Sequence, residues 1–200
     1  MPDRELNIRT LDARSLRGLA HPLRIRLLSA LRHHGPATAS RLAERLGESS
    51  GATSYHLRQL AAHGFVVDAP ERGKGRERWW RAAHDGTLFD ENLIHDPDPA
   101  VRGAADVFLQ QVASIHAQEL NRWLGGAQHW PLAWRRGSDL SDFTLRLGPE
   151  QALDLIHQLH AVIDSFRDRV PDGVPDGDAP GAEGVESVRV QVHVFPRADR

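Results

Sequence analysis

The 200-residue chain has no cysteine, only one lysine (Lys74) and no long apolar run. Without cysteine there can be no disulfide, no thiolate metal site and no thiol redox chemistry. No stretch approaches the ~18 apolar residues that a membrane-spanning helix needs, and the first ten residues contain no apolar signal core. We therefore expect a cytoplasmic protein with no membrane partner.

The sequence also lacks the common catalytic motifs. There is no Gly-x-Ser-x-Gly elbow and no His-Glu-x-x-His pair, and the carboxylates fall in expected loops or on the outer faces of expected helices. These absences predict a protein that is not an enzyme and needs no cofactor. An enzymatic C-terminal domain would require a pocket of converging polar groups that the sequence does not reveal.

Charge is divided unevenly along the chain, although the net charge is only −2. Residues 1–86 hold 15 Lys and Arg against 9 Asp and Glu, whereas residues 87–200 hold 10 against 18. A basic half joined to an acidic half suggests that the first half presents a surface to a polyanion.

Helical periodicity dominates the first half of the chain. Leucines at helical spacing predict two helices between residues 11 and 34, and Pro22 suits the first turn of the second. A third helix begins at the cap Thr38 and a fourth at the cap Ser49, the latter ending at Gly64.

Two short strands follow, "FVVDA" and "RERWWRA", around the loop "PERGKG". Three helices, a glycine-containing turn between the last two and then a β-hairpin are the order of a winged helix-turn-helix. In the second strand, Trp79 and Trp80 should point to opposite faces, one into the core and the other against the C-terminal half.

The outer face of the fourth helix carries Ser54, Tyr55, Arg58 and Gln59 and no acid. An ordinary solvated helix would carry Glu and Lys there. A helix that enters a DNA major groove needs small residues for close approach and donors that reach bases or phosphates. The hairpin adds basic side chains that can reach phosphates or the minor groove, namely Arg72, Lys74, Arg76 and Arg78.

The second half reads as helix, strand, helix, strand. A long helix is expected over 99–124, strands over 141–147 and 185–195, and a helix over 149–170. Two strands and one helix make too small a sheet to stand alone, so we expect them to pack on the long helix and on its copy in a second subunit. Whether the strands pair within one subunit or across two stays open. The expected dimerisation residues are Val101, Ala105, Phe108, Val112 and Ile115.

Four segments, "LAHPLRIRLLSAL", "SRLAERLG", "SYHLRQLAAHGFV" and "GRERWWRA", together resemble the ArsR family of bacterial winged-helix regulators, especially larger members with a C-terminal domain. The resemblance covers about residues 11–82. It implies a homodimer that binds operator DNA, usually as a repressor, and that releases DNA on a signal. It also implies that the DNA contacts of the recognition helix are Ser50, Ala52, Ser54, Tyr55, His56, Arg58 and Gln59. To these we add the cap hydroxyls Thr38 and Ser49 and the basic hairpin residues as candidate DNA contacts.

Metal sensing is the point at which the chain departs from that family. Some members carry a Cys-x-Cys box on the helix before the recognition helix, where this chain reads "SRLAERL", so that arsenic-, cadmium- or lead-type site cannot exist. The histidine-rich alternative is His157, His160 and Asp164 on one face of the last helix. A solvated helix surface explains these three residues as well, and we predict no metal site.

The sequence thus predicts a mainly α protein with small β elements (α+β). Residues 1–86 would form a winged helix-turn-helix and residues 87–200 a dimerisation and sensing domain. The function expected is sequence-specific binding of double-stranded DNA at an inverted repeat by a homodimer that acts as a repressor. The signal that releases the DNA is not identified by the sequence, and a small-molecule effector is one candidate. Two other readings stay open: an architectural winged-helix protein without effector, and a winged helix that binds an acidic protein.

Overall fold

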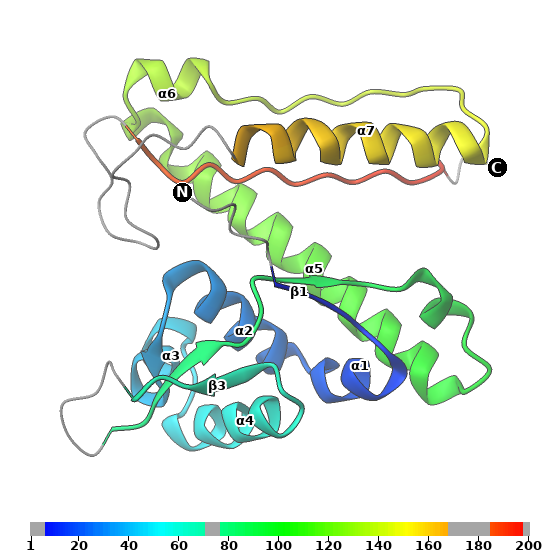
Figure 1. The fold of residues 1–200 in the computed structure, drawn as a ribbon. Coiled ribbons are helices and arrows are strands. Elements are labelled where there is room, and N and C mark those ends of the chain that lie inside the picture. The colour runs from blue at the N-terminus through cyan, green and yellow to red at the C-terminus, as the bar shows by residue number, and fades with distance from the viewer. Residues whose placement is uncertain (1–6, 71–76, 168–184, 198–200) are drawn as a thin grey trace. The chain divides into compact units, whose positions relative to one another are not determined.

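Figure 1 shows the fold as a computed structural model. The chain forms two compact units, Met1–Leu120 and Asn121–Arg200, which are described separately. The division falls within the long helix α5 (Pro99–Gly126), whereas the sequence placed the domain boundary after residue 86. Residues 99–120 of α5 therefore belong with the N-terminal elements. The structure describes residues 7–70, 77–167 and 185–197.

Four helices form the body of the first unit, as the sequence predicted (Figure 1). They are α1 (Ala13–Leu19), α2 (Pro22–His34), α3 (Ala39–Leu46) and α4 (Ser50–Ala62). Each begins at a side chain that accepts a hydrogen bond from a backbone N–H of the first turn. These capping residues are Asp12, His21, Thr38 and Ser49.

Two small sheets complete the first unit. The antiparallel sheet has the order β2 (Ala37–Thr38), β4 (Trp79–Ala82), β3 (Val66–Asp68), and β3 and β4 are the two predicted hairpin strands. The second sheet pairs β1 (Ile8–Thr10) with β5 (Gly86–Leu88) in parallel. Three of these strands, β1, β2 and β5, were not predicted, because two or three residues are too few to show alternation. A 3-10 helix over Glu91–His95 then leads to α5.

The core of the first unit is built from the leucine-rich faces of its helices. Leu16, Leu27, Leu57 and Leu60 are fully buried, and Trp80 from β4 closes the core beside them. The start of α5 joins the same core. The winged helix-turn-helix order predicted from sequence is therefore the observed order, with a further helix packed on it.

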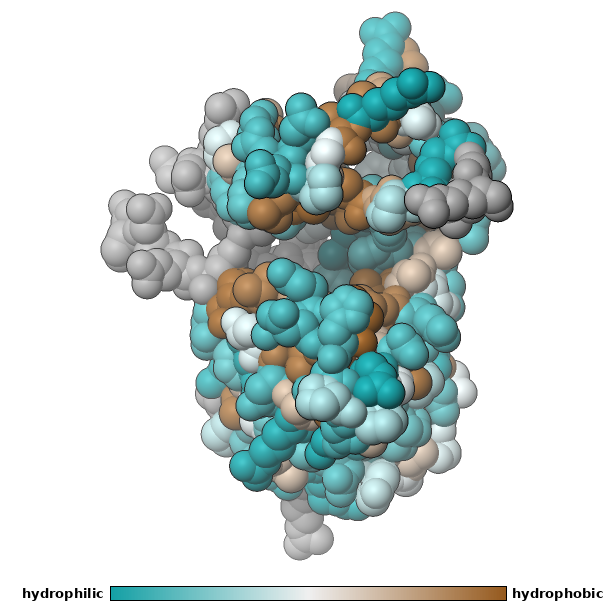
Figure 2. All heavy atoms as spheres, turned by 90° about the vertical axis from the view of Figure 1, so that its right-hand side faces the viewer, coloured by the Kyte–Doolittle hydropathy of each residue, from teal (hydrophilic) through white to brown (hydrophobic). Residues whose placement is uncertain are grey.

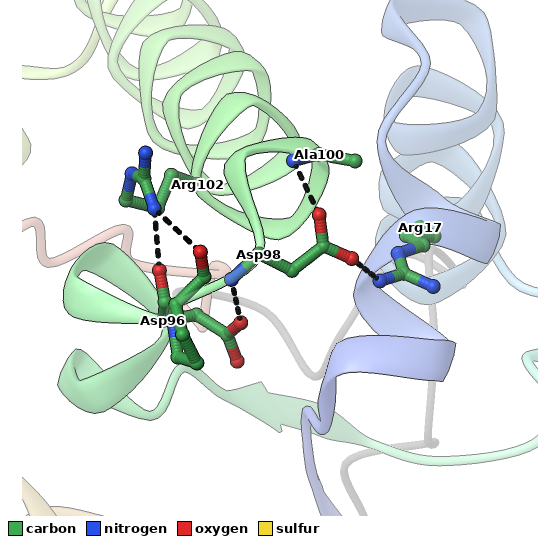
Figure 3. Close-up of polar contacts among 6 residues, drawn as sticks. Arg17, Asp96, Asp98, Ala100 and Arg102 are labelled. Atoms are coloured by element: carbon green, nitrogen blue, oxygen red, sulfur yellow. Dashed lines mark hydrogen bonds and ion pairs between the residues drawn. The ribbon is translucent and has the colours of Figure 1, made fainter.

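The beginning of α5 is fixed to α1 by a hydrogen-bonded network (Figure 3). Asp98 Oδ1 accepts from the N–H of Ala100 at 2.8 Å, and the other Asp98 oxygen forms an ion pair with the Arg17 guanidinium. Asp96 Oδ1 accepts from the N–H of Asp98 at 2.8 Å, and Arg102 Nη1 donates to the Asp96 carbonyl at 2.7 Å. Asp98 is thus both the cap of α5 and its anchor on α1.

The second unit contains the end of α5, a 3-10 turn over Ala127–His129, α6 (Leu132–Arg136) and α7 (Pro149–Arg167). The predicted helix over 149–170 is confirmed as α7 in its described part. The predicted strands over 141–147 and 185–195 are extended segments that belong to no sheet of the described residues. In Figure 1, α7 lies between these two segments. An alternating pattern sets an extended backbone, but a sheet also needs a neighbouring strand.

Many apolar side chains of the second unit lie at the surface between polar ones (Figure 2). In the extended segment 141–147, Phe143 is 80% exposed and Leu145 is 59% exposed. No helix in the described part of the chain has both the length and the apolar character needed to cross a bilayer.

Candidate nucleic-acid interface

Helix α4 buries one face and exposes the other. Thr53, Leu57 and Leu60 are completely buried. On the opposite side Tyr55 is 52% exposed and Arg58 is exposed. The remaining predicted contact residues of the helix are exposed (Ser49, Ser50) or half-buried (Ala52, Ser54, His56, Gln59). Apolar spacing of 3–4 residues fixes this orientation, so the donor-bearing face predicted from sequence is the outer face.

The N-terminal end of α4 is open to an anion. Ser49 Oγ caps the helix by accepting from the N–H of Ala52 at 3.2 Å, and the first turn holds no acidic residue. Before it, Gly47 ends α3 with φ 67°, a left-handed conformation that glycine adopts without strain. The positive end of the helix dipole and its unpaired N–H groups favour a phosphate at this position.

A groove of about 220 Å³ lies where α3, α4 and the β-hairpin meet. Ser40 lines it from α3, Ser54 and Arg58 from α4, and Arg78 with the acidic Glu77 from the hairpin. Serine and arginine side chains are donors for phosphate oxygens and base edges. The groove therefore joins the outer face of α4 to the hairpin.

Arg78 is held by acidic and aromatic neighbours rather than projecting alone. Its Nη2 donates to Asp68 Oδ2 at 2.9 Å, and its guanidinium lies 4.1 Å from the ring centre of Trp80. The hydrogen bond from Arg78 lowers the pKa of Asp68, and the same bond raises the pKa of Arg78. The other three basic hairpin residues, Arg72, Lys74 and Arg76, lie outside the described residues.

Two predicted contact residues have structural positions that differ from the rest. Thr38 is only 4% exposed, and its hydroxyl caps α3 by accepting from the N–H of Arg41 at 3.4 Å. His56 turns toward α2, where its ring lies tilted by 35° against the ring of His21, with 4.2 Å between centroids. The structure thus places Ser54, Tyr55, Arg58 and Gln59 on the outer side but turns Thr38 and His56 inward.

The histidine pair forms a half-buried polar cluster between α4 and the start of α2. His21 Nδ1 accepts from the N–H of Leu23 at 3.2 Å, whereas His56 Nδ1 is buried with no hydrogen-bond partner among the described residues. Burial is the main cause that lowers the pKa of His21. The positive charge of Arg24 lowers it further, and the negative charge of Glu48 opposes the shift. The pKa of His56 is lowered first by burial and next by His21. Both imidazoles are accordingly neutral near pH 7.

Sequence reasoning missed two contributors on α3. Ser40 lines the groove, and Arg41 lies over the outer tryptophan Trp79, 4.8 Å from its ring centre. Trp80 is the core tryptophan, as alternation required, and Trp79 is in contact with Arg41 of α3. The signal was available, because Ser40 and Arg41 follow directly on the cap of the helix before the turn.

The predicted dimerisation residues of α5 lie against the first unit. Val101, Ala105 and Phe108 are buried in its core, where the Phe108 ring stacks on Phe89 at 5.6 Å. Val112 and Ile115 are partly buried and pack on the same core. These five residues are therefore covered by their own chain.

His157, His160 and Asp164 lie exposed on α7. The described residues, His157, His160 and Asp164 among them, contain no group of three or more His, Asp or Glu side chains placed to hold a metal ion.

Parts of the chain are similar to known proteins. A family model described as "Helix-turn-helix domain" matches residues 19–68. Among solved structures, the chain is similar to the homodimeric winged helix-turn-helix DNA-binding domain (fragment 1–100) of Mb0332 from Mycobacterium bovis, which is described as a possible ArsR-family transcriptional regulator. The two sequences are 23% identical, and the match covers 54% of this chain and 82% of that chain with a TM-score of 0.33. It is 14% identical to disulfide-formed AbfR, covering 53% of this chain and 70% of that chain with a TM-score of 0.27. No curated protein matches the chain.

Proposed function

We propose that the protein is a sequence-specific, DNA-binding transcriptional regulator of ArsR type that acts as a homodimeric repressor in the cytoplasm. The outer face of α4 carries this proposal, because it presents Ser54, Tyr55 and Arg58 and no acid, beside an anion-ready helix start. The match of residues 19–68 to a helix-turn-helix domain supports the same assignment.

In this proposal α4 is the recognition helix. Tyr55, Arg58 and Gln59 reach base edges in the major groove, while Ser49, Ser50 and the helix start hold a phosphate. The hairpin contacts the flanking backbone. In a dimer, two copies of α4 would enter successive major grooves, which requires an inverted repeat with half-sites about one helical turn apart.

Dimerisation through α5 has to use a face that the first unit leaves open. Val107 and Leu109 are 39% and 38% exposed on α5, whereas the five residues expected from sequence pack inward. A small-molecule effector would act by changing the distance or angle between the two copies of α4. The proposal includes no catalytic step and no metal.

The test is fluorescence anisotropy with duplex DNA from the region upstream of the protein's own gene, at several salt concentrations, with scrambled duplex as control. The expected result is an affinity that falls steeply with salt and exceeds that for scrambled duplex by ~10³ or more. Arg58→Ala should remove most of this preference. Arg136→Ala, which removes the same charge from an exposed position of the second unit, should preserve it.

Two rival functions give different results in this experiment. An architectural protein would bind own and scrambled duplex alike, with an equal salt dependence. A winged helix that binds an acidic protein would show little affinity for either duplex. Release of bound DNA by a small molecule would identify the effector.

A further inference from the structure

The extended segment Ser141–Leu147 has the chemistry of a β-strand without a sheet. Phe143, Leu145 and Leu147 alternate with the polar residues Asp142, Thr144 and Arg146. Among the described residues, the backbone of this segment makes no hydrogen bond to any other segment. An open row of N–H and C=O groups beside exposed apolar side chains is a template for another strand.

We propose that this segment pairs antiparallel with the same segment of a second copy of the chain, about a two-fold axis at Thr144. The proposal rests on the homodimer included in the proposed function and adds a defined interface to it. The other extended segment of the second unit, 185–197, lies on the opposite side of α7 in Figure 1.

The register follows from the side chains. An antiparallel pairing keeps the apolar residues on one face only if the two-fold axis passes through a residue, and 143, 144 and 145 are the central choices. With the axis at Thr144, Asp142 faces Arg146 of the second copy, and Phe143 faces Leu145. Shifting the axis to residue 143 or 145 places Thr144 opposite a charged side chain and breaks both ion pairs.

The pairing is self-complementary, as a two-fold interface requires. Asp142 and Arg146 are both exposed and make no ion pair among the described residues. Each dimer would contain two Asp142–Arg146 pairs and two Phe143–Leu145 pairs. Opposite charges and aromatic–aliphatic contacts directly across a sheet both stabilise the pairing.

The absence of native cysteine makes cross-linking a clean test in the full-length chain. Opposed Cα atoms in an antiparallel pair lie about 4.5–5.5 Å apart, which a disulfide spans. In Thr144→Cys the two sulfurs face each other. In the control Ser141→Cys, which leaves both proposed ion pairs intact, the two cysteines are six residues out of step, about 20 Å apart, which a disulfide cannot span. Under mild oxidation, Thr144→Cys should form covalent dimer about tenfold faster than Ser141→Cys.

A charge exchange tests the register without oxidation. Asp142→Arg places like charges opposite each other and should weaken dimerisation roughly tenfold, whereas the double variant D142R/R146D restores the original pairing. Light scattering on the uncross-linked proteins measures both effects. Restoration in the double variant supports the register, and equal dimerisation of all three proteins overturns it.

These measurements separate failure of this interface from failure of the proposed function. A wild-type dimer that binds its operator but shows equal cross-linking of both cysteine variants would overturn the strand pairing alone. A monomer that binds no operator would overturn both.

Discussion

Gly18 in α1 packs against His63, and its replacement by alanine should have opposite effects on stability with and without the His63 imidazole. A Cβ atom added at Gly18 would lie 2.3 Å from Cγ and 2.4 Å from Nδ1 of His63. His63 ends α4, and its carbonyl accepts from Arg9 Nη1 at 2.7 Å. Because Cγ is the first ring atom, the clash can be relieved only by rotating the whole imidazole or moving the end of α4.

Two opposing contributions set the magnitude for Gly18→Ala. Replacing glycine by alanine inside a helix stabilises by about 1 kcal/mol, whereas overpacking costs about 1–3 kcal/mol. In the wild-type background the change should therefore destabilise by up to about 2 kcal/mol. In the His63→Ala background the clash is absent, and the same change should stabilise by up to about 1 kcal/mol.

Urea unfolding of the four proteins of this double-mutant cycle measures the coupling. Gly51→Ala is the matched control, because a Cβ atom at Gly51 on α4 meets nothing within 4 Å. This substitution should stabilise the protein equally in both backgrounds. Amide hydrogen exchange in α1 and α4 assigns the change to the first unit. If Gly18→Ala stabilises the wild type as much as it stabilises the His63→Ala protein, the imidazole moves aside freely and the reasoning is refuted.

Three further predictions follow from the first unit. The pKa values of His21 and His56 are lowered in the folded protein, so the unfolded chain binds protons that the folded chain does not. The free energy of unfolding should therefore fall as pH drops from about 7 to 5. Across this range the urea midpoint of a His56→Asn variant should change less than that of the wild type. Asp98→Ala removes the cap of α5 and should cost about 1 kcal/mol, read by urea unfolding and by faster hydrogen exchange at the start of α5. Trp80→Ala should cost about 3–5 kcal/mol because its ring is buried, whereas Trp79→Ala, at the half-buried face, should cost clearly less in the same assay.

The helices could be read from the sequence because their signals are local. Leu57 and Leu60 are one turn apart, and their burial fixes which side of α4 faces outward. Ser49 and Gly64 mark its ends through a cap hydroxyl and a left-handed φ of 72°. No knowledge of distant residues is needed for any of these features.

Contacts between distant residues could not be read in the same way. Arg17 and Asp98 are 81 positions apart, and neither has a local pattern that names the other. The alternation in 141–147 correctly indicated an extended backbone, but the neighbouring strand that would make it a sheet is not specified by that pattern. Amphipathic spacing on α5 likewise identified an apolar face without saying whether its own chain or a second copy covers it.

Two histidines of the candidate recognition helix, one within it and one at its end, contact neighbouring helices. His56 lies on His21 at the start of α2, while His63 lies on α1 at Gly18. Burial is the main cause of the lowered pKa of each α4 histidine, and the positive charge of Arg24 lowers both further. Protonation would therefore put charge into both of these contacts, one between α4 and α2 and the other between the end of α4 and α1. Neither contact lies on the exposed donor face of α4. Mild acidification should nevertheless change both the stability of the protein and the affinity of α4 for DNA.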